Sequence, residues 1–335
     1  MILLLLVTVS LGLFSVMRYS RSGKLRIFEK SESQSLKGVL ALLIVAHHVS
    51  YYSSSMILSE FSYWGNVVCG CFFFLSGMGL MKSRLLKGES YFMGFLFRHL
   101  WKLFTTVFLV AILWSLSLYI IVGKSVSYYL SSIKSGDTFI PNTWFVYVLS
   151  LLYLFYYITF GWLKSKRFLY SLLLLLLLIV LYVWMTACIG FGSFWYSSVF
   201  AFWMGVFFPI LEYKSTKTIE IRFATKYILI CTMTIVILST ALYSLYVHPI
   251  VYAPFLCTLF PVFLYLTLCV TGLPQNELID FVGRISYELY VVHGVFLFYL
   301  HSFFQGFTLF VIVTAGSVLT SFYLHKLSVR LNQLV

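Results

Sequence analysis

One stretch of the chain is almost entirely apolar: FLYSLLLLLLLIVLYVWMTAC, at residues 168–188. It has no charged residue, and about 20 apolar residues of helix are enough to cross the hydrocarbon core of a bilayer. Ten other stretches have similar character, so the sequence predicts an all-α, polytopic transmembrane helical bundle of about eleven spans. The other spans are expected at 1–17, 36–53, 62–81, 103–122, 143–160, 194–211, 227–247, 251–271, 285–302 and 307–325.

The composition supports a membrane protein and argues against other classes. Hydrophobic residues make up 61% and charged residues 10% of the chain, whereas a soluble domain carries about 25% charged residues. The formal net charge is +13, but the basic residues are spread over short loops, so we expect no nucleic-acid partner. The six cysteines form no CxxC pair, and we interpret them as packing residues and expect no metal site.

The basic residues also predict the orientation. Residues 1–17 have no Lys or Arg before their apolar core and no small-residue cleavage pattern, which favours a retained helix over a secretion signal. With the N-terminus outside and the C-terminus inside, every Lys and Arg except Lys124 and Lys134 is cytoplasmic, as the positive-inside rule requires. We therefore expect a multi-pass protein of the cytoplasmic membrane. Residues 1–35 would form an N-terminal helix and basic linker, and 36–335 the main membrane domain.

The second predicted span places two ionisable side chains on one face. It contains KGVLALLIVAHHVSYY, from Lys37 to residue 52. Eleven helical residues rise about 16 Å and return to within about 20° of the starting direction, so Lys37 and His48 share a face and His47 does not. A histidine at mid-depth can be a proton acceptor or a structural hydrogen-bonding residue. The lysine can anchor the helix at the membrane border or bind a ligand there.

Two further segments at the cytoplasmic side have candidate ligand-binding residues. Ser76 and Gly77 are small residues in the otherwise bulky CFFFLSGMGL at 71–80. They allow close helix packing, or they expose backbone N–H groups to a ligand. Arg98 and Lys102 lie about one turn apart in FLFRHLWKLF at 95–104. They can be ordinary positive-inside residues, or they can hold a phosphate-bearing molecule.

The tenth predicted span begins with GRISYELYVVHGVF, at residues 283–296. Ser286, Tyr290 and His293 are spaced i, i+4 and i+7 and therefore share one helical face. This face could be the wall of a polar cavity, or its side chains could form structural hydrogen bonds. Arg284 and Glu288 are also four residues apart and could pair, which would lower the cost of burying the carboxylate.

These motifs together resemble the acyltransferase-3 family of integral-membrane acyltransferases. Four segments carry the resemblance, in the family's order: Lys37-x10-His48, Ser76-Gly77-Met78, Trp144-Phe145 and Ser286-Tyr287-x-x-Tyr290-x-x-His293. The sequence departs from the family pattern in having Met78 where the family has Phe. Where the family has Arg-x-x-Arg, it has His99-x-x-Lys102, or Arg98 spaced one residue further from Lys102. The family core has ten spans, and the chain would add one N-terminal helix to it.

The resemblance implies a function and a role for each candidate residue. The expected reaction is O-acylation, most simply O-acetylation, of a hydroxyl of a cell-envelope or exported polysaccharide. The donor would be a cytoplasmic acyl-CoA such as acetyl-CoA, with no permanently bound cofactor. His48 would be the general base or a transient acyl acceptor. Lys37, Arg98 and Lys102 would hold the CoA phosphates, and Ser76 and Gly77 would line the pantetheine path. Trp144, Tyr287, Tyr290 and His293 would line the substrate cavity.

Another class of membrane protein also fits part of the sequence. Many spans with intramembrane histidines are compatible with a transporter or flippase of a saccharide or lipid precursor. However, the chain has no detectable inverted halves and no acidic residues in its central spans, which proton-coupled transport commonly uses. A structural role would follow if His48 faced lipid. Expected partners are acyl-CoA, the carbohydrate acceptor, membrane lipids and, as candidates, polysaccharide-biosynthesis proteins.

Overall fold

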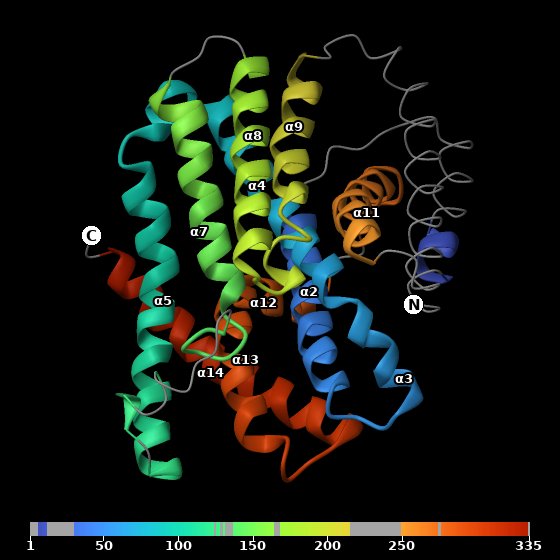
Figure 1. Cartoon of the computed structure of the whole chain (residues 1–335), viewed down its shortest axis with the longest axis vertical. Helices are drawn as coiled ribbons and strands as arrows, with labels where there is room; N and C mark the ends of the chain where they lie inside the picture. Colours follow the sequence, from blue (N-terminus) through green and yellow to red (C-terminus); the bar gives the residue numbers. More distant parts are fainter. Residues whose placement is uncertain are drawn as a thin grey trace.

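A computed structural model describes residues 6–11, 30–123, 125–127, 130, 137–163, 168–214, 249–273 and 276–333 (Figure 1). All regular structure in these ranges is helical. The α-helices are α2 (Lys30–Ser50), α3 (Met56–Ser59), α4 (Gly65–Lys87), α5 (Phe95–Ser117), α7 (Trp144–Tyr156), α8 (Phe168–Ile189), α9 (Phe200–Lys214), α11 (Pro249–Thr271), α12 (Glu277–Arg284), α13 (Ser286–Leu300) and α14 (Gly306–Gln333). Short 3-10 helices are η1 (Glu60–Tyr63), η2 (Gly88–Phe92) and η5 (Ser193–Trp195), and π-helical turns are η3 (Leu118–Val122) and η4 (Tyr157–Trp162).

Seven helical segments within the described residues are long and apolar enough to cross a membrane. They are Gly65–Phe92, Phe95–Val122, Trp144–Trp162, Phe168–Ile189, Ser193–Tyr213, Ala253–Thr271 and Gly306–Gln333. An eighth crossing results if α12 and α13, which meet at an angle of 77°, are taken as one bent span. The all-helical, multi-pass prediction is thus confirmed. The predicted span 36–53 corresponds to α2, which is not among the seven. The span 227–247 and most of 1–17 lie outside the described residues, so eleven spans and the orientation stay predictions.

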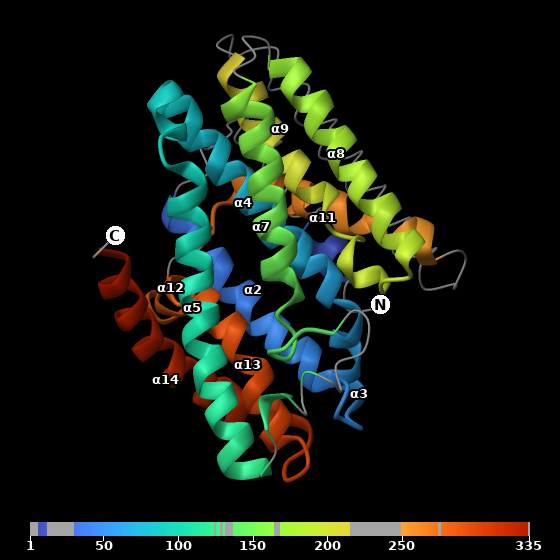
Figure 2. The same ribbon diagram turned by 60° about the vertical axis from the view of Figure 1, so that its left-hand side comes forward.

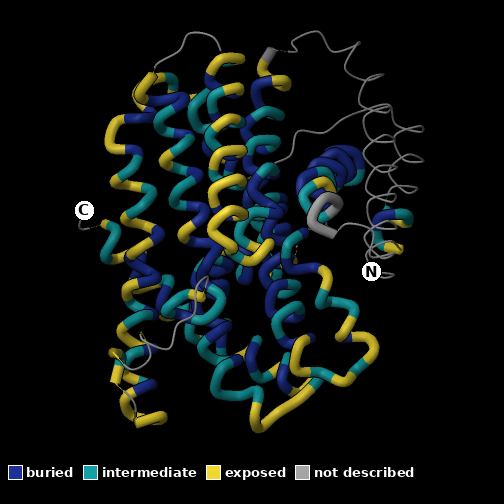
Figure 3. Tube along the Cα trace, viewed as in Figure 1, coloured by how far each residue is buried: buried dark blue, intermediate teal, exposed yellow. Residues whose placement is uncertain are grey.

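The helices divide into a buried centre and a more exposed periphery. Figures 1 and 2 show α7, α8 and α9 side by side at one end of the molecule, and α2, α13 and α14 towards the other. In α4 and α11, 72% of the most apolar window is buried, against 22% in α5 and 28% in α8 (Figure 3). The exposed side chains of α5 and α8 are mainly Leu, Ile, Val and Phe, which fits a surface in contact with lipid.

Glycine lets the central helix α4 pack closely on α9. A Cβ atom added at Gly77 would overlap the carbonyl oxygen of Phe202, and one added at Gly205 would overlap that of Phe74. Two turns of backbone therefore touch directly, as small residues allow in membrane helices. Gly79 lies two residues further along α4. A Cβ atom added there would meet no atom within 4 Å, so Gly79 faces open space.

We expect Gly77→Val to destabilise the fold strongly and Gly79→Val to be tolerated. The new side chain at residue 77 must push two backbones apart, and overpacking of this kind costs about 1–3 kcal/mol or more. The thermal unfolding midpoint of the detergent-purified variants measures the difference. Because both substitutions place Val in the same helix, the helix-propensity cost is shared. Equal midpoints for the two variants would show that the close approach at Gly77 contributes nothing.

A second close approach joins α2 to α12. A Cβ at Gly38 would overlap the carbonyl oxygen of Ile279, and one at Gly283 would overlap that of Gln34. The Gln34 amide donates to the Asp280 carbonyl oxygen over 3.3 Å, which fixes the crossing. This crossing matters for the site because each glycine has a basic neighbour in the sequence, Lys37 on α2 and Arg284 on α12.

The pair that Arg284 and Glu288 could form on a continuous helix does not form. The chain turns by 77° between α12 and α13, so the two residues are not one turn apart on a continuous helix. Glu288 instead lies 3.0 Å from Nδ1 of His325 on α14. Its carboxylate is buried, and its partner comes from a helix that the sequence pattern could not place beside it.

Candidate active site

Two cavities of the described structure meet at one side chain. The first, here called the cation cavity, has a volume of about 320 Å³ and receives basic residues from four helices. The second, here called the histidine cavity, has a volume of about 430 Å³ and contains His47 and His48 of α2. Tyr290 of α13 lines both. The hydroxyl group of Tyr290 donates a hydrogen bond to the carbonyl oxygen of Asn142, which holds the side chain across the boundary.

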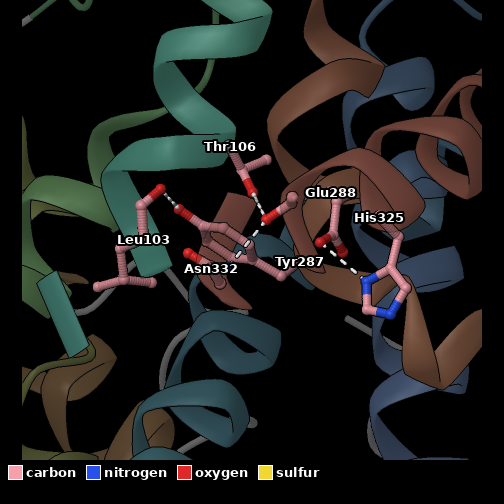
Figure 4. Close-up of polar contacts among 7 residues, drawn as sticks. Leu103, Thr106, Tyr287, Glu288, His325 and Asn332 are labelled. Atoms are coloured by element: carbon pink, nitrogen blue, oxygen red, sulfur yellow. Dashed lines mark hydrogen bonds and ion pairs between the residues drawn. The ribbon is translucent and has the colours of Figure 1, made fainter. Parts of the chain in front are cut away.

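The cation cavity carries an excess of positive charge. Lys37, Lys102 and Arg284 line it, together with His99 and His325. The carboxylate in the lining is Glu288, and it is paired with His325 (Figure 4). The basic groups of Lys37, Lys102 and Arg284 are therefore not neutralised by the carboxylate in this lining, and their arrangement suits a phosphate or another strong anion.

Hydrogen bonds between helices hold the wall of the cation cavity. The hydroxyl group of Tyr287 donates to the carbonyl oxygen of Leu103 over 2.8 Å, joining α13 to α5 (Figure 4). Thr106 donates to Ser328 over 3.4 Å and joins α5 to α14. The basic residues on α5 and α14 thus sit on helices that are tied to one another. The remaining lining is largely aromatic, with Ser76 as a small polar residue on α4.

The two adjacent histidines of the histidine cavity have different surroundings. The Nδ1 atom of His47 lies 3.0 Å from the Phe61 carbonyl oxygen, and its Nε2 atom lies 3.4 Å from the Tyr51 hydroxyl. Both nitrogens of His47 therefore have protein partners. His48 forms no hydrogen bond with any residue that the structure describes, although it lines the same cavity. Of the two imidazoles, His48 is the one available to a bound molecule.

The histidine cavity otherwise combines aromatic rings with small polar groups. Trp144 and Phe194 form an aromatic corner with ring centroids 5.5 Å apart. Ser62, Asn66 and Ser193 supply hydroxyl and amide groups to the lining. Flat rings beside hydrogen-bonding groups are the combination that recognises a molecule with both C–H faces and hydroxyls.

The predicted site residues divide between the two cavities. Lys37, Ser76, Lys102 and Tyr287 line the cation cavity, His48 and Trp144 line the histidine cavity, and Tyr290 lines both. Lys37 and His48 share a helical face as predicted, but they open into different cavities. His293 is fully buried behind His48, with ring centroids 5.0 Å apart.

Two predicted donor-binding residues lie elsewhere. Gly77 faces α9, so the structure places it in a helix contact and not in the lining of the cation cavity. Arg98 is exposed, and its guanidinium donates to the Tyr91 carbonyl oxygen over 2.9 Å. Its neighbour His99 lines the cavity instead.

The sequence pattern does not identify Arg284, Glu288 or His325 as ligand-binding residues, although all three line the cation cavity. Arg284 lies two residues before Ser286, but its spacing suggests only a possible ion pair, and Glu288 is the other member of that possible pair. His325 has no local signal, because its place in the site depends on how α14 crosses α13.

Comparison with known proteins adds one match. The model of the acyltransferase domain family, acyltransferase-3, matches residues 32–326, which include every site residue discussed above. No curated protein and no solved structure matches the chain.

Proposed function

The chain belongs to the acyltransferase-3 family, and from this premise we propose that it is an O-acyltransferase of the cytoplasmic membrane. The acyl group, most simply acetyl, comes from a cytoplasmic acyl-CoA. The acceptor is a hydroxyl group of a cell-envelope or exported polysaccharide. The observation that carries the proposal is the meeting of a cationic cavity and an imidazole-bearing cavity at a single side chain, Tyr290.

The cation cavity supports the assignment of the donor. A CoA thioester has phosphates at one end and the reactive carbonyl at the other. Phosphates bound by Lys37, Lys102 and Arg284 would leave the pantetheine arm to pass Ser76 and bring the thioester towards Tyr290. Arg284 takes the place in this proposal that the motif spacing predicted for Arg98.

The histidine cavity supports the assignment of the acceptor. A sugar ring has an apolar C–H face, which can stack on Trp144, and hydroxyls, which Ser62 and Asn66 can bind. His48 is the acceptor-side base. It removes the proton from the acceptor hydroxyl, and the hydroxyl oxygen attacks the thioester carbonyl. The C–S bond breaks, and the leaving thiolate takes the proton from His48. A variant of the same scheme, in which His48 carries the acyl group transiently, uses the same geometry.

The test is a transfer assay with purified protein in lipid nanodiscs. Labelled acetyl-CoA and a soluble oligosaccharide acceptor are added, and both free CoA thiol and labelled acceptor are measured. The proposal predicts equal amounts of the two products. In parallel, mass spectrometry of surface glycans from cells with and without the gene should show the loss of an acyl mass. Unchanged thiol and unchanged glycans, together with saccharide uptake into sealed vesicles, would favour a transporter.

We expect Arg284→Gln to raise the KM for acetyl-CoA about tenfold and Arg98→Gln to leave it nearly unchanged. Losing one charge-assisted hydrogen bond to a phosphate costs about 1.5–3 kcal/mol, and a tenfold change in affinity corresponds to about 1.4 kcal/mol. Initial rates over a range of acetyl-CoA concentrations measure the effect. Arg98 is a matched control, because it has the same charge but is exposed and bonded to a backbone carbonyl. A larger effect at Arg98 than at Arg284 would contradict the assignment.

A further inference from the structure

His293 has a fixed proton arrangement. Its Nδ1 atom lies 2.7 Å from the backbone carbonyl oxygen of Tyr290. A carbonyl oxygen only accepts hydrogen bonds, so Nδ1 carries the ring proton. In the neutral ring the other nitrogen, Nε2, is then unprotonated and can only accept.

This acceptor nitrogen is buried without a partner. His293 is fully buried, and its Nε2 atom forms no hydrogen bond with any described residue. An unsatisfied buried polar atom costs about 1–3 kcal/mol, so such an atom in a native structure calls for a donor. Two neighbouring polar side chains are already engaged: the Tyr290 hydroxyl with the Asn142 carbonyl oxygen, and His47 with Phe61 and Tyr51.

The ring of His48 lies next to that of His293 and has no hydrogen bond to a described residue. The two ring centroids are 5.0 Å apart, with an angle of 35° between the ring planes. A modest rotation of the His48 side chain, which is only partly buried, would direct one of its N–H groups to the His293 Nε2 atom.

We propose that His293 is a positioning residue that accepts a hydrogen bond from His48 and thereby sets which nitrogen of His48 is the base. This proposal rests on the proposed function. The nitrogen of His48 that faces His293 keeps its proton, so the other nitrogen is unprotonated and faces the histidine cavity. When His48 takes the proton of the acceptor hydroxyl, it becomes an imidazolium, and its hydrogen bond to His293 becomes charge-assisted and stronger. No proton moves to His293. A base oriented by a third buried group is a recurrent arrangement in acyl-transfer enzymes.

The proposal predicts a specific kinetic pattern. His293→Ala should lower kcat by about 10–100-fold, the usual loss when a group that orients a functional histidine is removed. The KM for acetyl-CoA should not change, because His293 does not line the cation cavity. His293→Gln should recover part of the kcat, because its amide oxygen can accept the same hydrogen bond. His301→Ala is the matched control: His301 follows the same helix and bonds the Leu297 carbonyl oxygen over 3.0 Å, but lines neither cavity.

A double variant distinguishes positioning from an independent role. If His293 acts through His48, the variant His48→Ala/His293→Ala should be no slower than His48→Ala alone. The proposal would be overturned if the loss of kcat in the double variant equalled the product of the two single-variant losses. It would also be overturned if His293→Ala kept the full kcat of the wild type. If the wild-type protein shows no acyl transfer in the assay, the proposed function itself is overturned.

A measurement that does not need turnover tests the same hydrogen bond. Protein labelled with ¹⁵N in histidine reports the proton on each ring nitrogen by NMR. His48 should show one protonated and one unprotonated nitrogen in the wild type, and averaged nitrogen shifts in His293→Ala. Averaged shifts for His48 in the wild type would overturn the proposal whatever the kinetics show. Elution volume and thermal midpoint of each variant confirm that it folds.

Discussion

His48→Ala should lower the rate of acyl transfer by about 10²–10⁴-fold, the contribution that a positioned general base makes to a reaction. The substitution removes the imidazole of the histidine cavity that has no hydrogen bond within the described part of the chain. Acetyl-CoA should still bind, because Lys37, Lys102 and Arg284 are untouched. The loss should therefore appear in kcat, while the KM for acetyl-CoA remains close to that of the wild type.

The adjacent histidine gives this prediction its control. His47→Gln removes an imidazole from the same cavity and the same helix, but one whose nitrogens are held by Phe61 and Tyr51. We expect this variant to lose some thermal stability and to lose far less kcat than His48→Ala. Free CoA thiol and labelled acceptor are measured for both. If the two variants lose kcat equally, the two histidines contribute equally to the activity, and His48 has no special role as the base. If His48→Ala still transfers at the wild-type rate, His48 is not the base.

The second large effect is expected for Lys37→Glu. The substitution replaces a basic side chain with an acidic one in a cavity that also contains Lys102, Arg284 and the paired Glu288. Under the proposed function it removes one attraction to the CoA phosphates and adds a repulsion. At about 1.5 kcal/mol or more for each, the KM for acetyl-CoA should rise by about 100-fold or more. Initial-rate kinetics at constant ionic strength measure the change.

Three comparisons make this result specific to phosphate binding. Lys37→Arg keeps the charge and should retain most of the affinity. Arg330→Glu makes the same change of charge at an exposed position that lines neither cavity, so its KM should stay near that of the wild type. Acetyl-pantetheine has no nucleotide phosphates, and the wild type and Lys37→Glu should use it about equally well. A comparable loss with acetyl-pantetheine would show that Lys37 acts on the thioester end or on folding.

The sequence predicted the helical bundle well because lipid imposes a simple requirement. Every backbone polar group in the hydrocarbon core must be paired within its own helix, so apolar length alone identifies candidates such as Phe168–Ile189. The shared face of Lys37 and His48 was also predictable, since it depends on helix periodicity alone. What periodicity could not supply is the neighbour that each face meets. Tyr290 projects from α13 between them and separates their surroundings into two cavities.

The site residues that sequence reasoning missed depend on long-range packing. Arg284 enters the cation cavity because glycines 38 and 283 let α2 and α12 cross closely and because the chain bends after α12. Arg98 and Lys102 are four residues apart and could share a face, but the long Arg98 side chain turns back to the carbonyl oxygen of Tyr91 in η2, before α5 begins. Gly77 had two interpretations from spacing. The open surroundings of Gly79 and the tight ones of Gly77 favour helix packing.

Under the proposed function, the hydrogen bond from Tyr290 to Asn142 would also limit the ion permeability of the membrane. Asn142 adopts a left-handed backbone conformation, with φ of 64°, that directs its carbonyl oxygen to the tyrosine hydroxyl. The tyrosine held there stands in the linings of both the cation cavity and the histidine cavity, which are separate cavities in the structure. Protons and other ions would leak through a continuous pore and dissipate the electrochemical gradient. Under the proposed function the cation cavity opens to the cytoplasm and the histidine cavity to the outside, and this one phenol ring would then keep the bilayer electrically sealed while the uncharged acyl group is transferred.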